Sequence, residues 1–131
     1  MSMEEVAVRS IRAALAEGRD TLLEPELYAV LQAGGVRTPQ FYTVATGHEG
    51  DPAPMRLPGE RAVVKVVSPR ITHKTEMGGV RVVSNTPDAI AAAVSEVREN
   101  VRQRGGDELA ASVREVLVSE FVKGDDSLGG Q

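Results

Sequence analysis

The sequence contains no cysteine and no tryptophan, and its aromatic side chains amount to two tyrosines and two phenylalanines. The lack of cysteine excludes a disulfide scaffold, cysteine-ligated zinc and a thiol nucleophile. The scarcity of aromatic rings disfavours a stacking surface for single-stranded nucleic acid. Basic residues are also in the minority, because 15 Lys and Arg stand against 19 Asp and Glu, a formal net charge of −4. We therefore expect no nucleic-acid partner.

The overall composition is that of an ordinary soluble globular protein. The 131 residues are 41% hydrophobic and 26% charged, which suits one domain with a single core. The longest apolar runs are only a few residues and are too short to span a bilayer. The first residues also lack the layout of a signal peptide. We therefore expect no membrane association and a cytoplasmic location.

Hydrophobic periodicity and turn residues divide the chain into helices and strands. We expect three helices, over 4–17, from 24–25 to the glycines at 34–35, and over 87–104. We expect four strands, over 41–44, 62–67, 80–83 and 113–122. Between the first two strands we expect a proline-containing loop over 47–59. In the clearest helix, Thr86 is the N-cap, Pro87 the first helical residue and Gly105 the stop. This order predicts an α/β (α+β) fold in which helices pack on one sheet.

Lys65 is unusual because it lies in the centre of a strand made otherwise of alanine and valine. A lysine is costly to bury without a partner. It can instead extend its charged end to the sheet edge, which is the more common situation. A cation held rigidly on a strand is also a good ligand for a phosphate, since it needs little reorganisation.

His73 lies in a polar segment between two expected strands, followed by Lys74 and the pair Gly78-Gly79. Glycines let backbone N–H groups approach an anion, and histidine can act as nucleophile or acid/base near neutral pH. Taken singly, a glycine pair is more often part of a turn and a loop histidine is more often inert. The other histidine, His48, has no cationic neighbours in the sequence and is interpreted as having no role.

The last strand ends in Glu120-Phe121-Val122. Backbone groups at a strand end can bind the edge of a base, and a carboxylate can accept a proton from an exocyclic amine. No P-loop, dinucleotide-binding fingerprint or zinc-protease motif occurs in the sequence. With two histidines and no cysteine, any metal site would have only oxygen ligands and would depend on a bound nucleotide, and we name no metal ligand in this chain.

In order along the chain, five stretches resemble the ATP-grasp region of the NDP-forming acyl-CoA synthetases, which include the ADP-forming acetate–CoA ligases. They are residues 23–27, 34–39, 64–69, 73–80 and 116–124. The stretch H-K-T-E-M-G-G-V at 73–80 is the most specific of them. The resemblance implies an incomplete ATP-grasp fold: one mixed sheet with helices packed on it, the first lobe only.

The resemblance implies a reversible reaction in which acyl-CoA, ADP and phosphate give free acid, CoA and ATP. His73 resembles the second phosphohistidine of that reaction, the one nearest the nucleotide. The resemblance assigns to the nucleotide the residues Lys65, Gly78, Gly79, Glu120, Phe121 and Val122. The lysine corresponds to the family's phosphate ligand, the glycines to the loop over the phosphates, and the last three residues to the hinge that holds adenine.

The resemblance also implies that these residues are part of a larger enzyme, with 1–20 as a linker helix and 21–131 as a partial ATP-grasp domain. ATP or ADP with Mg²⁺ is the expected cofactor, and the Mg²⁺ ligands are expected outside this chain. CoA-binding and ligase domains are the expected partners, and the chain alone is expected to be inactive. The family usually has a helix before the lysine strand, whereas this sequence has Pro52, Pro54 and Pro58 in that interval.

Two alternatives to the ligase part remain open at this point. One is a regulatory ATP-grasp module of a protein lysine acyltransferase. The other is a non-catalytic fragment that forms a homo-oligomer through the surface its missing lobe would cover. The residues do not distinguish ADP from GDP, and they do not identify the acyl substrate.

Overall fold

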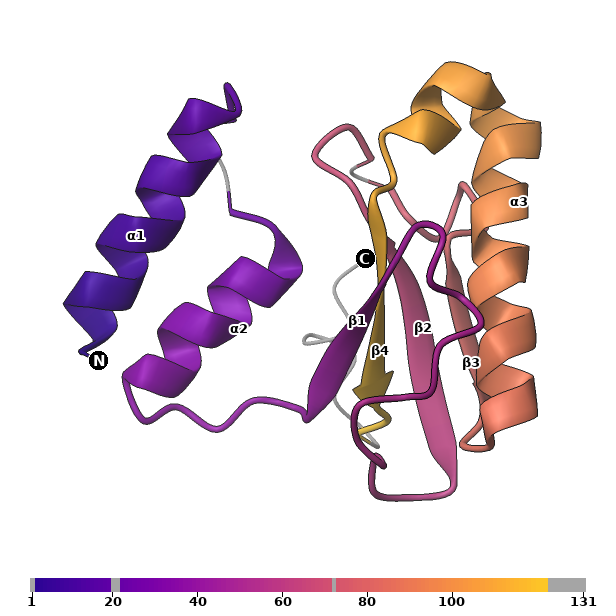
Figure 1. Cartoon of the computed structure of the whole chain (residues 1–131), viewed down its shortest axis with the longest axis horizontal. Helices are drawn as coiled ribbons and strands as arrows, with labels where there is room; N and C mark the ends of the chain where they lie inside the picture. The colour runs from indigo at the N-terminus through magenta and orange to yellow at the C-terminus, as the bar shows by residue number, and fades with distance from the viewer. Residues whose placement is uncertain (1, 20–21, 72, 123–131) are drawn as a thin grey trace. The chain divides into compact units, whose positions relative to one another are not determined.

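The structure is a computed structural model that describes residues 2–19, 22–71 and 73–122 (Figure 1). The chain divides into two compact units, Met1–Thr38 and Pro39–Gln131. The first unit holds helices α1 (Met3–Ala16) and α2 (Glu24–Ala33). The helix at the start of the expected ATP-grasp portion therefore lies in the same unit as the expected linker helix.

Helix α1 is capped by Ser2, whose hydroxyl accepts a hydrogen bond from the backbone N–H of Glu5 at 3.1 Å. This bond satisfies one of the donors that every helix N-terminus leaves open. After the helix, Gly18 adopts a φ of +78°, a conformation that glycine takes without strain. Both predicted helices of this unit are confirmed to within one or two residues.

A partly buried ion pair joins the segment after α1 to the first turn of α2. Arg19 donates two hydrogen bonds of 2.9 Å to the two carboxylate oxygens of Glu26. The same carboxylate accepts the backbone N–H of Leu23 at 2.7 Å. The guanidinium and this N–H lower the pKa of Glu26 below its usual value.

The second unit contains a four-stranded sheet and one long helix. The strands are β1 (Phe41–Ala45), β2 (Arg61–Val67), β3 (Val80–Ser84) and β4 (Glu115–Glu120), and their order is β1-β4-β2-β3. All three pairings are antiparallel, so the described sheet is antiparallel and not mixed as expected. The reason is the path of the chain. After β3 the chain crosses over through the long helix, and β4 then inserts between β1 and β2 and runs opposite to both of them.

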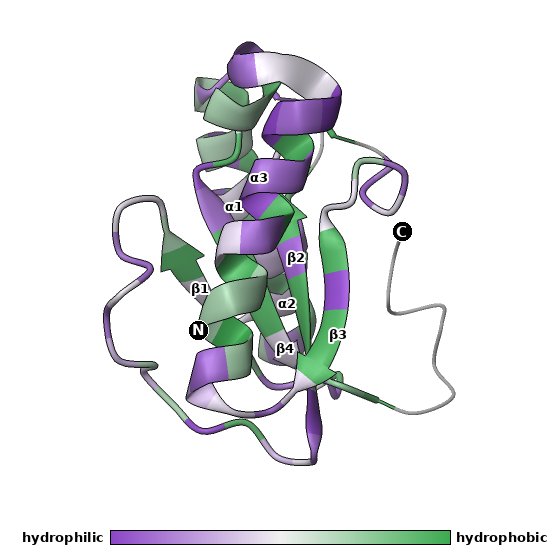
Figure 2. Cartoon of the chain, turned by 90° about the vertical axis from the view of Figure 1, so that its right-hand side faces the viewer, coloured by the Kyte–Doolittle hydropathy of each residue, from purple (hydrophilic) through white to green (hydrophobic). Residues whose placement is uncertain are grey.

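Helix α3 (Pro87–Ala111) covers one face of this sheet. Thr86 caps it through a hydrogen bond from the N–H of Ala89, as the sequence predicts. The buried side chains of this face and of the helix are Tyr42, Ala62, Val64, Val66, Val116, Val118, Ala93, Val94, Val97 and Val101. Figure 2 looks at the sheet from the α3 side and shows β2 and β4 coloured mainly as hydrophobic.

The structure refines one predicted boundary and corrects another. The predicted helix end at Gly105 is confirmed to within one residue, because Gly106 breaks the helical geometry of α3 with a φ of +91°. A further helical segment, which was not predicted, then continues to Ala111 and places Leu109 against the core. Strand β4 is also shorter than the predicted 113–122, because the N–H of Val113 bonds to the carbonyl of Ala110 in the turn that ends α3.

Among the helices in the described part of the chain, none is both long enough and apolar enough to cross a membrane.

Candidate functional site

Lys65 lies on the face of the sheet opposite α3. Its neighbours in the strand, Val64 and Val66, belong to the α3-side core, and side chains alternate between faces along a strand. It is paired with Leu117 of β4 on one side and with Val80 of β3 on the other. Its exposure is only 2%, which is rare for a lysine in a water-soluble domain. A buried cation at the middle of a sheet is therefore the most unusual feature of this face.

The segment between β2 and β3 carries the predicted histidine and glycines, and it closes on itself through backbone hydrogen bonds. The N–H of Gly78 bonds to the carbonyl of Thr75 at 3.0 Å, and that of Gly79 bonds to the carbonyl of Lys74 at 2.8 Å. The predicted role of these amides as phosphate donors therefore requires that both bonds open. His73 is exposed in this segment, and its carbonyl accepts the N–H of Met77 at 3.3 Å.

The two glycines are held by close packing as well. A Cβ on Gly79 would lie 2.6 Å from Cγ2 of Val66, and one on Gly78 would lie 2.9 Å from Cβ of Asn100. Gly78 also has a φ of +69°. Asn100 of α3 donates a 2.9 Å hydrogen bond to the carbonyl of Gly78, and Arg104 donates one of 2.7 Å to the carbonyl of Glu76. The segment is thus fixed to β2 and α3 at its glycine end.

The predicted hinge lies at the end of the sheet away from the glycines, where β2 begins and β4 ends. It consists of Glu120, Phe121 and Val122. Glu120 is opposite Ala62, so its side chain is on the α3 side of the sheet and not on the Lys65 side. Its carboxylate accepts the N–H of Gln40 at 2.9 Å, and its own N–H bonds to the Gln40 carbonyl at 2.9 Å. The predicted hinge role on the Lys65 side therefore falls to residues 121–122.

Phe121 and Val122 are each 39% exposed. The guanidinium of Arg61 lies over the Phe121 ring, 5.9 Å from its centre, a cation–π geometry. This contact links the first residue of β2 to the residue after β4.

Strand β2 therefore connects the predicted residues in a line. Glu120 is level with Ala62, whereas the carbonyl of Gly79 accepts the N–H of Val66 four residues further on. With a rise of about 3.3 Å per residue, these two levels are about 13 Å apart. Lys65 lies between them, close to the glycine end. An elongated ligand with a flat group at 121–122 would pass Lys65 with its other end near Gly79.

No group of three or more His, Cys, Asp or Glu side chains capable of holding a metal ion occurs in the described ranges.

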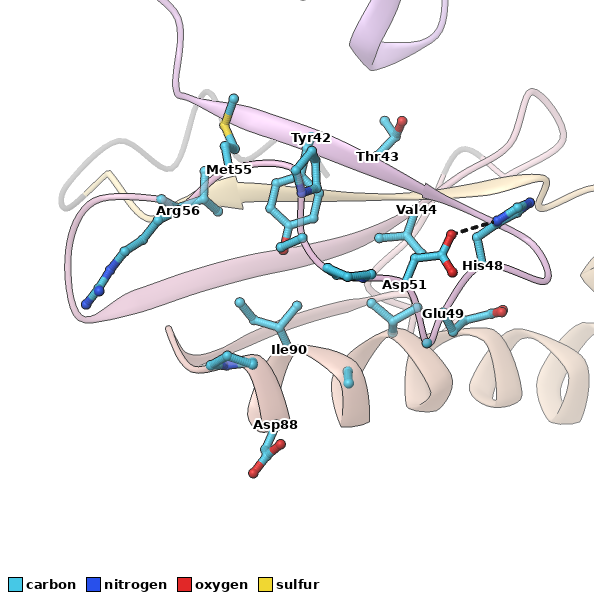
Figure 3. A pocket seen from close by; sticks show the side chains of 18 of the residues that line it. Tyr42, Thr43, Val44, His48, Glu49, Asp51, Met55, Arg56, Asp88 and Ile90 are labelled. Atoms are coloured by element: carbon cyan, nitrogen blue, oxygen red, sulfur yellow. Dashed lines mark hydrogen bonds and ion pairs between the residues drawn. The ribbon is translucent and has the colours of Figure 1, made fainter.

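A separate cavity of about 1100 Å³ lies on the α3 side of the sheet (Figure 3). None of the predicted site residues lines it. Its walls come from β1, from residues 48–57 and from the first turns of α3. Figure 3 shows the Tyr42 ring directed into this space, and burial raises the pKa of the Tyr42 hydroxyl.

The proline-containing segment forms the outer wall of this cavity. At its edge, Nδ1 of His48 lies 2.8 Å from Oδ2 of Asp51, with both side chains exposed. Leu57 is buried, and Asn85 donates hydrogen bonds to the carbonyls of Leu57 and Gly59 at 2.8 and 2.9 Å. The only signal in the sequence for this cavity is the run of prolines, which excludes a covering helix but does not show what lies beneath it.

Comparison with known proteins gives matches over nearly the whole chain. The family model ATP-grasp_5, described as an ATP-grasp domain, matches residues 13–128. The 4-hydroxybutyrate–CoA ligase (ADP-forming) of Nitrosopumilus maritimus is 31% identical over 112 residues, which are 86% of this chain and 16% of that protein. The beta subunit of acetate–CoA ligase (ADP-forming) I of Pyrococcus furiosus is 32% identical over 95 residues, which are 70% of this chain and 39% of that subunit.

A solved structure with the same fold is the dinucleotide-forming acetyl-coenzyme A synthetase 1 of Ca. Korarchaeum cryptofilum, in complex with coenzyme A, Ca-AMPCP and HgCl+. The TM-score is 0.64 at 26% identity, covering 86% of this chain and 47% of that chain. The chain thus spans less than half the length of each of these three proteins.

Proposed function

Because this chain belongs to the ATP-grasp domain family, we propose that the Lys65 face of its sheet binds the nucleotide of an ADP-forming acyl-CoA ligase. The reaction of the complete ligase converts acyl-CoA, ADP and phosphate to free acid, CoA and ATP. Support comes from the relatives, two of which are named as ADP-forming CoA ligases. The single observation that carries the proposal is the burial of Lys65 between the two predicted ends of the ligand site.

Lys65 would neutralise the phosphates, and the backbone at Phe121 and Val122 would hold the base. Catalysis of phosphoryl transfer is mainly positioning and charge neutralisation, so a cation fixed on a central strand is well suited to it. Since Lys65 is only 2% exposed in this chain, a ligand would reach it only after the groups that cover it move aside.

For Gly78 and Gly79 we propose a role through packing. Their N–H groups bond to Thr75 and Lys74, and their α-carbons touch Asn100 and Val66. A side chain at either position would push the segment away from the sheet. Bound in this way, the glycines would fix the segment that presents His73.

His73 would carry the phosphoryl group in the complete ligase. A ring nitrogen of His73 forms a bond to phosphorus as the bond to the donor histidine of another domain breaks. A terminal oxygen of the ADP β-phosphate then attacks that phosphorus, the bond to His73 breaks, and ATP and a free imidazole remain. The exposure of His73 is consistent with access by a second domain.

The partners in this proposal are the CoA-binding and ligase domains and the second lobe of the ATP-grasp fold, which together would supply the acyl chemistry and the Mg²⁺ ligands. Within the chain we keep 21–131 as the partial ATP-grasp domain and 1–20 as the linker helix.

Titration of the chain with MgADP, followed by amide chemical shifts, tests the nucleotide site. We expect shifts centred on β2 and residues 121–122, and Lys65→Met should weaken binding about 10- to 100-fold, the equivalent of one charge-assisted hydrogen bond. Arg81→Met is the matched control, because Arg81 is a cation opposite Val64 and lies on the α3 face. Unchanged affinity in Lys65→Met, or an equal loss in Arg81→Met, would contradict the assignment.

The phosphohistidine is tested in the complete ligase with His73→Asn. We expect loss of ATP formation and retention of MgADP binding, since the imidazole is needed for transfer and not for nucleotide affinity. His48→Asn is the control within the same chain, because His48 is the only other histidine. Full turnover by the His73→Asn enzyme would exclude this role.

A further inference from the structure

Helix α1 exposes a line of apolar side chains. Val8, Ile11 and Leu15 are 48%, 48% and 62% exposed, although each is large and hydrophobic. The side of α1 that packs within its own unit is a different one, on which Ala14 is buried and Met3 lies against Gly34. At 100° per residue, the exposed line is turned roughly a quarter of a circle away from the packed side.

The spacing of this line is that of a coiled-coil seam. Val8, Ile11 and Leu15 are separated by three and four residues, which makes them positions a, d and a of a heptad. The e positions beside the seam are then Glu5 and Arg12, which are opposite in charge. On the other side, the g positions are alanines, residues 7 and 14, whose small side chains let α2 approach closely.

We propose that α1 pairs in antiparallel orientation with α1 of a second copy of this chain. In an antiparallel pair the e positions of the two helices face each other, so Glu5 of each copy meets Arg12 of the other. Twofold symmetry creates this ion pair twice. The same arrangement sets Glu4, at a d position, against Leu15 of the other copy.

A parallel pair is disfavoured by the same residues. It would set Glu4 against Glu4 in the seam and Arg12 against alanine at a g position, so it gains no ion pair and adds a repulsion.

The helical hairpins of two copies would then form a four-helix bundle, with the α2 helices on the g sides. Because the seam has only three apolar residues per copy, we expect a dimer that dissociates on dilution. This inference is independent of the nucleotide site, since no residue of the seam lies in the second unit.

Sedimentation equilibrium of the full chain over a wide concentration series is the test. The wild-type mass should rise from 13.9 kDa towards twice that value. Arg12→Glu should raise the dissociation constant about tenfold or more, because two attractive contacts become repulsive. Arg9→Glu is the matched control, since it makes the same change of charge at the b position and should leave the dissociation constant within about twofold.

Mixing two variants gives the sharpest outcome. Glu5→Arg and Arg12→Glu should each be mainly monomeric alone, yet their equimolar mixture should form a heterodimer, because every e–e contact in it is attractive. Circular dichroism of each variant checks that α1 is still helical. A wild-type chain that stays monomeric at all concentrations would overturn the proposal, and so would a mixture that shows no gain or an Arg9→Glu variant as weak as Arg12→Glu.

Discussion

Gly79→Ala should destabilise the second unit by overpacking. The added Cβ would lie 2.6 Å from Cγ2 of Val66 and 3.3 Å from the carbonyl oxygen of Lys74. Val66 is fully buried in the core and cannot rotate into solvent, so the contact must be relieved by moving the segment or the strand. Such overpacking costs about 1–3 kcal/mol. In a unit of this size, about 2 kcal/mol corresponds to a fall in Tm of about 10 °C.

The origin of that cost is tested by a double-mutant cycle with Val66→Ala. The single Val66→Ala change should cost about 2–3 kcal/mol through lost burial and a cavity. In the double variant the new methyl group of residue 79 occupies part of that cavity. We therefore expect the combined loss to be about 1–2 kcal/mol smaller than the sum of the single losses.

The assay is urea unfolding of the four proteins at one pH, followed by far-ultraviolet circular dichroism. Val118→Ala is the control partner, because Val118 is equally buried on the same face but lies on β4, away from Gly79. Its effect should add to that of Gly79→Ala. A Gly79→Ala variant as stable as the wild type, or strict additivity with Val66→Ala, would refute the close packing of this segment on β2.

Asn100→Ala should leave the carbonyl of Gly78 without its 2.9 Å hydrogen bond and lower the free energy of unfolding by about 1–2 kcal/mol. It should also speed hydrogen exchange at the amides of Gly78 and Gly79 more than elsewhere. Unchanged exchange at these two amides would contradict the anchoring role of Asn100. Glu26→Gln should remove a pH-dependent part of the stability of the helical hairpin. Because the pKa of Glu26 is lowered in the folded state, chiefly by the hydrogen bonds from Arg19, its contribution is present above its ordinary pKa and is lost as the pH falls through the lowered value. Thermal unfolding at a series of pH values should therefore show wild type and variant converging in acid, and a constant difference at all pH values would exclude this cause.

Much of the fold could be predicted because local signals and burial agree. The valine run of β2 and the capped start of α3 were predicted from residue type alone, and both are confirmed. The break in α3 lies within one residue of the predicted glycine stop, whereas the helical segment beyond it could not be predicted, because it depends on tertiary burial of Leu109. The antiparallel sheet could not be deduced from the order of elements, since that order does not show where the last strand inserts.

Some features of the candidate site could likewise be predicted from the sequence, and others could not. Alternation along β2 places Lys65 opposite the core, and the same rule applied to β4 would have placed the Glu120 side chain on the α3 face. The hydrogen bonds that already engage the amides of Gly78 and Gly79 could not be foreseen, because they depend on the path of the segment. The cavity beneath residues 48–57 depends on side chains from three distant segments, and nothing in the sequence brings them together.

The position of β4 in the sheet has a consequence for synthesis of the chain. This strand lies between β1 and β2, yet it begins about 70 residues after β1 ends. At about 5–20 residues per second, a ribosome needs on the order of 4–14 s to deliver it. Until then β1 has no neighbour and β2 presents an open hydrophobic edge, the kind of surface that aggregates or recruits chaperones. The nascent chain is thus most vulnerable in the interval just before residue 115 leaves the exit tunnel, and slowing of translation in that interval should lower its yield.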